Sequence, residues 1–367
     1  MHRRSVKILS ALAAASLALV ACGEDAGGDG EASEVELTLV TAALDGTPNA
    51  AYQDRFLDLL EERSDNRISV ERTEAYSLCD AQEVADCVID GRADLGVTIP
   101  DYTPQYFPST SMVSIPFIGD DWQGVTQSLY ELHLENDDAA AVMEENGLHH
   151  ISTWPVGRLL IGSEEPVESP EDLEGVTMSV SGPLGQRLFE ESGANISALP
   201  ANELYEGLDR GVIDVAAGGL DFPVNYSLYE VLPHWTDPGF TEYTSFGMWM
   251  NLDTYNDMPE DLREIVDEVT REVAGGEGGE AHRAQAEQQC EEMQDAPDVE
   301  SMTMWDSDVV DSWREEFGDE IQDAWVDLAE SNGLNNAQSV LDQYLESLEE
   351  NAEGFEDATL TCVENYS

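Results

Sequence analysis

After its first seven residues the 367-residue chain contains no lysine, and basic residues of any kind are scarce. The sequence has 15 Lys and Arg against 78 Asp and Glu, a formal net charge of −63. Because phosphate binding requires positive charge, this balance excludes a nucleic-acid partner. The carboxylates are spread over the chain, which favours a solvated surface adapted to salty or alkaline surroundings over a docking site for a basic partner.

Long apolar runs are also scarce. One run, residues 8–21, follows a basic N-terminus and is too short for a membrane span, so it predicts a secretory signal peptide over residues 1–21. It ends in the sequence LVAC, which matches a lipobox and predicts lipid on Cys22; the alternative is an ordinary signal with a chance cysteine. Residues 22–34 are rich in Gly and acids and predict a flexible tether. We therefore expect an extracytoplasmic protein that is anchored by lipid to the outer face of the cell membrane.

Cysteine is rare: apart from Cys22 there are four. In an exported chain an even number predicts two disulfides more than reactive thiols. The sequence permits three connectivities. We expect Cys79 to pair with Cys87, because they flank one short segment, and Cys290 with Cys362, because both lie in the C-terminal region. No histidine stands at ligand spacing beside these cysteines, so we expect no metal site.

Motifs of catalysis are missing as well. The sequence contains no G-x-S-x-G, no H-E-x-x-H and no phosphate-binding glycine loop. His149 and His150 are adjacent in a strand-like stretch, where successive side chains point to opposite faces, so they cannot share one metal ion. We therefore expect neither an enzyme nor a bound cofactor.

The pattern of apolar residues predicts two α/β units followed by a helical region. Alternation of strand and helix in each unit indicates a helix-covered sheet. In the first unit the strand-like segments are 35–40, 67–72 and 93–99, with helices from 48 and over 80–89. In the second they are 149–154, 158–162, 176–180 and 212–216, with helices over 184–192 and 202–210. The later helices are expected at 259–274, 282–294, 307–332 and 337–350, with a glycine-rich interruption at 275–279.

Three linked segments then carry a family resemblance. They are the pair Gly157-Arg158, the run PVESPEDLEGV at 166–176, and NELYEGLDRGVID at 202–214, with Gly193-Ala194 between the last two. In their order and spacing they resemble the solute-binding subunits of TRAP transporters, most of all the dicarboxylate-receptor (DctP) branch. The segments DGRADLG at 90–96, IPF at 115–117 and MPEDL at 258–262 are similar to further motifs of that family.

The resemblance implies a two-lobed periplasmic-binding-protein-like α/β fold with mixed sheets, a long inter-lobe helix and a helical C-terminal region. It places lobe I at 35–154, completed by 240–275, and lobe II at 155–239, completed by 276–367. The lobes would close over a small organic solute and deliver it to a permease of a small and a large membrane subunit, driven by a sodium gradient without ATP. Closure would be a population shift towards the state that the ligand contacts best.

The sequence departs from this family in the expected binding site. Most members hold a substrate carboxylate with an arginine where this chain has Ser179. Gly218 replaces an asparagine that contacts ligand, and Ala201 replaces an aromatic residue. All three changes shorten the side chain, and one of them removes a charge.

Two interpretations of the ligand follow. In the first, which we favour, Arg158 keeps its family position and binds the anionic group of a bulky organic acid; a structural salt bridge is the alternative role of this residue. In the second, the ligand is neutral or cationic and is selected by acids and aromatics. The residues expected in that case are Asp221, Tyr102, Phe222, Tyr243 and Trp249, although core packing explains the aromatics equally well.

Other functions remain compatible with the sequence. The chain could serve an ATP-driven importer or deliver signals to a sensor kinase, and neighbouring genes for four-span and twelve-span membrane subunits would decide for the TRAP system. An enzyme would reveal itself by turnover of a bound small molecule.

Overall fold

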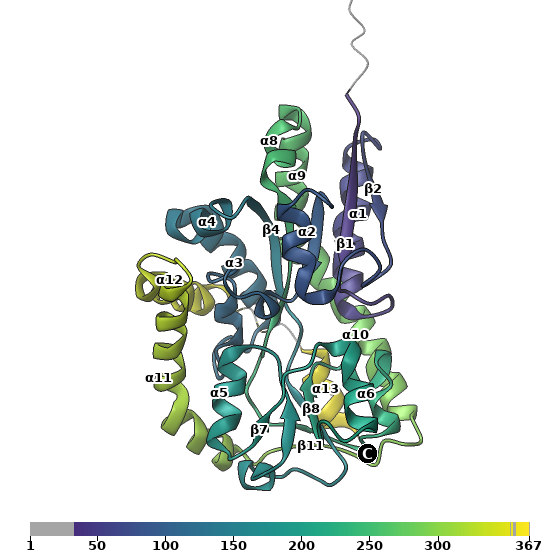
Figure 1. Ribbon diagram of the computed structural model, residues 1–367, viewed down its shortest axis with the longest axis vertical. Coiled ribbons are helices and arrows are strands. Elements are labelled where there is room, and N and C mark those ends of the chain that lie inside the picture. The colour runs from purple at the N-terminus through teal and green to yellow at the C-terminus, as the bar shows by residue number, and fades with distance from the viewer. Residues whose placement is uncertain (1–32, 353, 355–356, 367) are drawn as a thin grey trace, which may run out of the picture. The chain divides into compact units, whose positions relative to one another are not determined.

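The computed structural model describes residues 33–352, 354 and 357–366. The predicted signal peptide, Cys22 and most of the predicted tether lie outside the described residues. From residue 34 onward the chain forms one compact unit with two mixed β-sheets, each covered by helices (Figure 1). We call the part built on the first sheet lobe I and the part built on the second lobe II. The two sheets confirm the predicted fold class.

Lobe I contains a five-stranded sheet with the order β2-β1-β3-β10-β4. The first three strands of the chain run parallel, whereas β10 runs antiparallel to both β3 and β4. β3 is buried along its whole length, as expected for a central strand under helices. The strands are β1 (Val35–Thr41), β2 (Ile68–Arg72), β3 (Leu95–Thr98), β4 (Leu148–Pro155) and β10 (Ser245–Asn251). The helices are α1 (Pro48–Arg63), α2 (Val84–Ile89), α3 (Trp122–Glu135), α4 (Asp137–Glu144) and α8 (Leu252–Asp257).

Lobe II contains a six-stranded sheet with the order β11-β9-β5-β8-β6-β7. β5 runs antiparallel to its two neighbours, and the remaining pairs are parallel. Its strands are β5 (Leu160–Ser163), β6 (Thr177–Ser179), β7 (Asn195–Ile196), β8 (Val215–Gly218), β9 (His234–Asp237) and β11 (Ser301–Met304). The helices between them are α5 (Pro183–Glu191), α6 (Leu204–Asp209) and α7 (Asp221–Asn225). Two connections, β4 to β5 and β9 to β10, therefore cross between the lobes.

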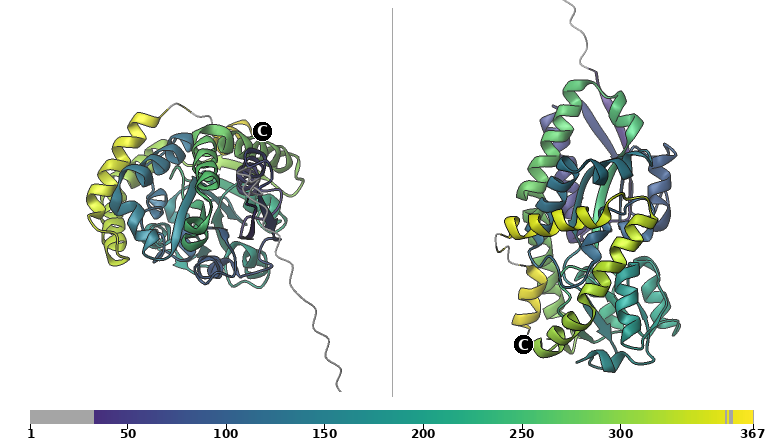
Figure 2. Two further views of the ribbon diagram at one scale, coloured as in Figure 1. Left: turned by 90° about the horizontal axis from the view of Figure 1, so that it is seen from above. Right: turned by 90° about the vertical axis from the view of Figure 1, so that its left-hand side faces the viewer.

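A long helical segment also joins the lobes. It consists of α9 (Glu260–Glu272), a π-helical turn (Val273–Glu277) and α10 (Gly278–Asp295). The predicted glycine-rich interruption is present as a kink, because Gly276 has a non-helical φ of 138° between the two helices. Only glycine adopts that backbone conformation without strain. α9 and the first part of α10 pack against α1 in lobe I, and α10 continues to α7 in lobe II (Figure 2).

The C-terminal helices divide between the lobes. α11 (Ser307–Ser331) packs against α5, whereas α12 (Ala337–Asn351) packs against α3 of lobe I, so the predicted assignment of all of 276–367 to lobe II differs from this packing. α13 (Ala358–Asn365) returns to α10. Disulfides join Cys79 to Cys87 and Cys290 to Cys362, which confirms the expected pairing. No helix in the described part of the chain has the length and apolarity needed to cross a membrane.

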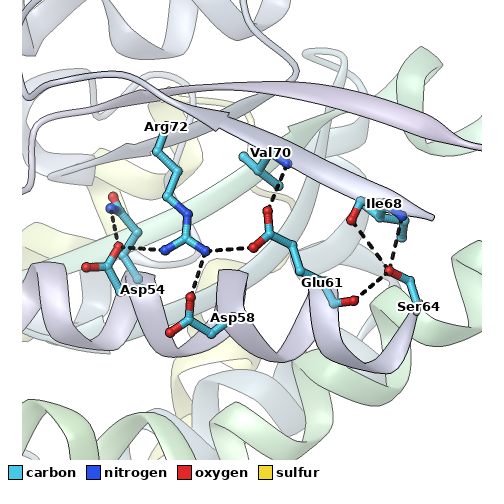
Figure 3. Close-up of polar contacts among 8 residues, drawn as sticks. Asp54, Asp58, Glu61, Ser64, Ile68, Val70 and Arg72 are labelled. Atoms are coloured by element: carbon cyan, nitrogen blue, oxygen red, sulfur yellow. Dashed lines mark hydrogen bonds and ion pairs between the residues drawn. The ribbon is translucent and has the colours of Figure 1, made fainter. Parts of the chain in front are cut away.

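One arginine on the acidic surface, Arg72, contacts three carboxylates. On the strand β2, Arg72 donates hydrogen bonds to Asp58 at 2.7 Å and Glu61 at 3.0 Å, and it lies 3.6 Å from Asp54 (Figure 3). These three acids follow one face of α1 at helical spacing. Glu61 also accepts the backbone N–H of Val70 at 3.2 Å, so the same cluster ties the helix to the edge strand.

Candidate functional site

Six polar side chains meet where the two lobes touch. Asp101 and Tyr102 lie in a helical turn directly after β3, and Asp221 opens α7 directly after β8. These positions follow the carboxyl ends of central strands, where open α/β sheets bind ligands. The remaining members come from the loop after β2, from the end of α7 and from the segment before β10. We call the set Tyr76, Asp101, Tyr102, Asp221, Tyr226 and Tyr243 the tyrosine–aspartate cluster.

Direct contacts across the cluster join the lobes. The Tyr76 and Tyr226 hydroxyls lie 2.9 Å apart and share a hydrogen bond. The backbone N–H of Ala201 donates to the Tyr102 hydroxyl at 3.3 Å. The Asp101 carboxylate also reaches lobe II, because its Oδ2 lies 2.5 Å from the position that a Cβ on Gly182 would occupy. The absent side chain of Gly182 therefore makes room for Asp101.

Asp101 is buried with only one of its carboxyl oxygens satisfied. Oδ2 accepts hydrogen bonds from Ser114 at 2.5 Å and from Thr244 at 2.7 Å, whereas Oδ1 has no hydrogen-bond partner. Burial raises the pKa of Asp101, and the two hydroxyl donors only partly oppose it.

Asp221 is the lobe II counterpart of Asp101. It is 5% exposed, and its Oδ1 has no hydrogen-bond partner. Burial raises the pKa of Asp221 to about 7, against the opposing effect of its own backbone N–H and that of Phe222 at the start of the helix. No positive side chain contributes to the pKa of either aspartate. Within the described part of the chain, the site therefore offers two buried carboxyls without a counter-ion.

The four tyrosines respond to the charge on these acids. Burial raises the pKa of Tyr76 to about 12 and raises the pKa of each of the other three. The negative charge of Asp221 raises all four further, and that of Asp101 acts on Tyr102 and Tyr243. The tyrosines are thus neutral at ordinary pH and present hydroxyl groups and aromatic rings. The Tyr243 hydroxyl is buried and makes no hydrogen bond of normal geometry.

The space left by Gly218 is filled by the protein itself. A Cβ on Gly218 would overlap the ring of Phe222, which is 4% exposed. The Phe222 ring meets Tyr226 edge-on, with the ring centres 5.6 Å apart. Phe222 therefore forms part of the wall beside the tyrosine–aspartate cluster.

Ser179, where the resemblance implies an arginine, forms hydrogen bonds with the backbone. Its hydroxyl accepts the N–H of Leu199 at 3.0 Å and lies 3.5 Å from the carbonyl oxygen of the same residue. The side chain is 2% exposed. It holds the loop that brings Ala201 to Tyr102.

Arg158 lies in a separate acidic cluster on the crossing segments. Its Nε donates to Asp237 at 2.7 Å, and it pairs in a β-bridge with Glu242. Burial raises the pKa of Glu242 well above its usual range; the charge of Asp357 adds to this, and Arg158 opposes it. The structure therefore places Arg158 in the salt bridge that the sequence left open as its alternative role.

Trp249 is part of the core of lobe I. Its ring stacks on Phe107 with the ring centres 4.0 Å apart, and its N–H points to the sulfur of Met143 at 3.1 Å. It is 1% exposed and does not belong to the tyrosine–aspartate cluster. Of the aromatics named from the sequence, Tyr102 and Tyr243 are in the cluster and Phe222 adjoins it.

Three members of the cluster were not expected from the sequence: Tyr76, Asp101 and Tyr226. For Asp101 a signal was available, since an acid directly after an apolar strand lies at the edge where α/β sheets bind ligands. Tyr76 and Tyr226 come together only through the contact between the lobes, 150 residues apart in the chain. Among the described residues, no group of three His, Cys, Asp or Glu is arranged to hold a metal ion.

Comparisons with known proteins agree with this architecture. The ectoine-binding periplasmic protein TeaA of Halomonas elongata is 23% identical over 315 residues, which cover 84% of this chain and 90% of that protein. A monocarboxylate 2-oxoacid-binding periplasmic protein of Nostoc is 26% identical over 290 residues, covering 74% and 76%.

Solved structures show the same fold. The ectoine-binding protein of Halomonas elongata matches with a TM-score of 0.75 at 21% identity, covering 86% of this chain and 99% of that one. A TRAP solute-binding protein of Rhodoferax ferrireducens with copurified benzoate matches with a TM-score of 0.76 at 18% identity, covering 87% and 99%. A family model described as bacterial extracellular solute-binding protein, family 7, or DctP, matches residues 39–327. The chain belongs to this family of bacterial extracellular solute-binding proteins.

Proposed function

We propose that the protein is the extracytoplasmic receptor of a TRAP-type transporter and captures one small organic solute between its lobes. The observation that carries the proposal is the tyrosine–aspartate cluster, which draws its side chains from both lobes at the carboxyl ends of β3 and β8. The family, and relatives named as solute-binding proteins, support a receptor and not an enzyme.

Closure of the lobes accounts for capture. The hydrogen bond between Tyr76 and Tyr226 and the one from the Ala201 N–H to Tyr102 can form only when the lobes meet. A solute that contacts both lobes adds interactions that the open state lacks, so it shifts the population towards closure. The closed receptor would then dock on a permease of a small and a large membrane subunit, which takes its energy from a sodium gradient.

The contacts of Arg158 bear on the chemical class of the solute. Solved relatives contain benzoate or mandelate, which supports an organic acid. To bind such an acid, however, Arg158 would have to leave Asp237, which is 1% exposed and would remain as a buried charge. Breaking a buried ion pair in this way costs about 3–5 kcal/mol. The contacts of Arg158 therefore support the second interpretation, a solute that does not need this arginine.

The lipid on Cys22 belongs to the same proposal. A tethered receptor stays within reach of its permease, so that delivery occurs at high effective concentration. Mass spectrometry of membrane-bound protein would detect the diacylglycerol on Cys22, and a Cys22→Ser variant should leave the membrane fraction.

Uptake tests the receptor function directly. The protein and the adjacent membrane subunits would be reconstituted in vesicles in high salt, with a labelled solute chosen by a thermal-shift screen of organic acids, amines and sugars. We expect uptake to require the receptor and a sodium gradient and to proceed without ATP. Uptake that follows ATP and ignores sodium would contradict the proposal.

A further inference from the structure

Asp101 in lobe I and Asp221 in lobe II are alike in their burial and hydrogen bonding. Each is a buried carboxyl with one oxygen that has no hydrogen-bond partner, and one comes from each lobe. Both act on the pKa of Tyr102 and of Tyr243, and Asp101 accepts a hydrogen bond from Thr244, the neighbour of Tyr243, so both acids lie close to this part of the cluster. A buried carboxyl oxygen without a hydrogen-bond partner is costly, and a ligand that donates to it would remove this cost.

The charges of Asp101 and Asp221 affect closure of the lobes. When both carboxyls are ionised, the closed state holds two negative charges buried away from water, and this desolvation opposes closure. A positive charge between them offsets that desolvation cost by attraction to both carboxylates. Because the acids belong to different lobes, the attraction acts in the closed state and is lost when the lobes separate.

The tyrosines indicate what kind of cation fits. Neutral phenol rings attract alkylated ammonium groups through cation–π interactions, and hydroxyl groups accept hydrogen bonds from amines. A divalent metal would instead require several oxygen ligands at close range. The described residues contain no group of three acidic or imidazole side chains placed for a metal. An organic ammonium group therefore matches the walls of the site better than an inorganic ion.

The arginine on the crossing segments is already held in an ion pair. Arg158 is held by Asp237, and neither Asp101 nor Asp221 has a positive side chain acting on its pKa. A purely anionic solute would meet two acids here without a basic partner.

On this basis, and resting on the proposed receptor function, we propose that Asp101 and Asp221 clamp an organic ammonium group of the solute between the lobes, against the rings of the tyrosine–aspartate cluster. Charge on the solute thereby both selects the ligand and drives closure.

Binding of chosen probes tests the clamp. Titration calorimetry would use choline as a permanent cation, glycine betaine as a zwitterion and benzoate as an anion, at constant ionic strength. We expect choline or glycine betaine to bind and benzoate not to bind. Binding of benzoate with no response to either ammonium compound would overturn the clamp and leave the receptor function standing.

Matched variants locate the charge. Asp221→Asn keeps the shape of the side chain, removes its charge and breaks no hydrogen bond of Oδ1, so the fold should survive. We expect it to weaken binding of the ammonium probe by at least about tenfold, as for a buried charge pair. Asp209→Asn on the exposed face of α6 makes the same change in net charge and should alter affinity less than about twofold.

Two further results would overturn the inference. One is an Asp221→Asn variant that binds the ammonium probe as tightly as the wild type. The other is a wild-type protein that binds none of the three probes. The receptor proposal fails separately, if vesicles show no sodium-driven uptake of any solute found by the screen.

Discussion

Arg158 and Asp237 form a buried ion pair, in which Nε donates to Oδ2 over 2.7 Å and the two side chains are 11% and 1% exposed. The pair lies on the segments that cross between the lobes, next to Glu242 and to Asp357 at the start of α13. Arg158 is therefore held in a salt bridge on the crossing segments, and its position in the family motif does not by itself make it a ligand-binding residue.

Replacing Arg158 with alanine distinguishes a structural role from a ligand-binding role. Arg158→Ala leaves Asp237 buried without its partner, so we expect the free energy of unfolding to fall by about 3 kcal/mol. Affinity for an ammonium probe should stay within about twofold of the wild type once the protein is folded. Urea denaturation and calorimetry would measure the two quantities. Loss of ligand binding with unchanged stability would restore Arg158 as the carboxylate-binding residue.

Asp221 should make stability depend on pH. Burial raises its pKa to about 7, whereas an unfolded carboxyl titrates near about 3.9. Between these values the folded state holds a proton that the unfolded state has lost, so the contribution of Asp221 to stability falls as pH rises from about 4 to about 7 and then levels off.

The matched variant isolates this effect. Asp101, Glu242 and Asp357 also have raised pKa values, so the wild-type profile alone mixes several groups. Asp221→Asn should gain stability relative to the wild type on going from pH 5 to pH 8, measured by urea denaturation, whereas Asp209→Asn should not. A constant difference between Asp221→Asn and the wild type at all pH values would refute the assignment.

Gly218 and Phe222 should behave as a coupled pair. Gly218→Asn places a side chain where the Phe222 ring lies, which should cost about 1–3 kcal/mol. Phe222→Ala should cost about 3 kcal/mol through the cavity that it leaves. In the double variant the asparagine occupies the emptied space, so the combined loss should be smaller than the two losses added. Strict additivity in thermal unfolding would show that the two positions do not compete.

The disulfides should differ in their effect on stability. Cys290 and Cys362 are 72 residues apart, whereas Cys79 and Cys87 are 8 apart. By loop-closure entropy, replacing Cys290 and Cys362 with alanine should lower the free energy of unfolding by about 4 kcal/mol, and replacing Cys79 and Cys87 by about 2–3 kcal/mol. The variant without the Cys79–Cys87 disulfide serves as the control for the variant without the Cys290–Cys362 disulfide. Equal losses of stability in urea denaturation would mean that the larger loop closed by the Cys290–Cys362 disulfide adds no further stability.

High salt should stabilise the folded chain. With a formal net charge of −63, self-repulsion opposes compaction, and salt screens it. We expect the melting temperature to rise between about 0.1 M and about 1 M sodium chloride, where the screening length shortens from about 10 Å to about 3 Å. A neutral osmolyte at matched osmolality is the control. A melting temperature that is independent of sodium chloride would argue against a surface adapted to salt.

Local sequence patterns predicted much of the fold. The strands and helices expected over 35–99 and 158–216 are present with shifted ends, but the strands β7, β9, β10 and β11 were not expected. The strand at 149–154 was expected in the second unit and instead pairs with β10 in the sheet of lobe I. The glycines near 276 were expected to interrupt a helix, and the backbone at Gly276 is indeed non-helical; both α9 and α10 pack against α1, on either side of this kink. The segment with α12 was expected in lobe II but packs on α3, a choice between two surfaces that helical periodicity does not encode.

The sequence by itself determined the charge balance, the scarcity of cysteine and the residues that mark the family, because each of these is a property of composition or of short spacing. Only the tertiary structure decided which charges are paired. Arg158 finds Asp237 at a separation of 79 residues, Tyr76 finds Tyr226 at 150, and Asp101 and Asp221 are buried without a basic partner. Whether a charge is neutralised depends on which surfaces come together when the chain packs, and no local pattern of residues contains that information.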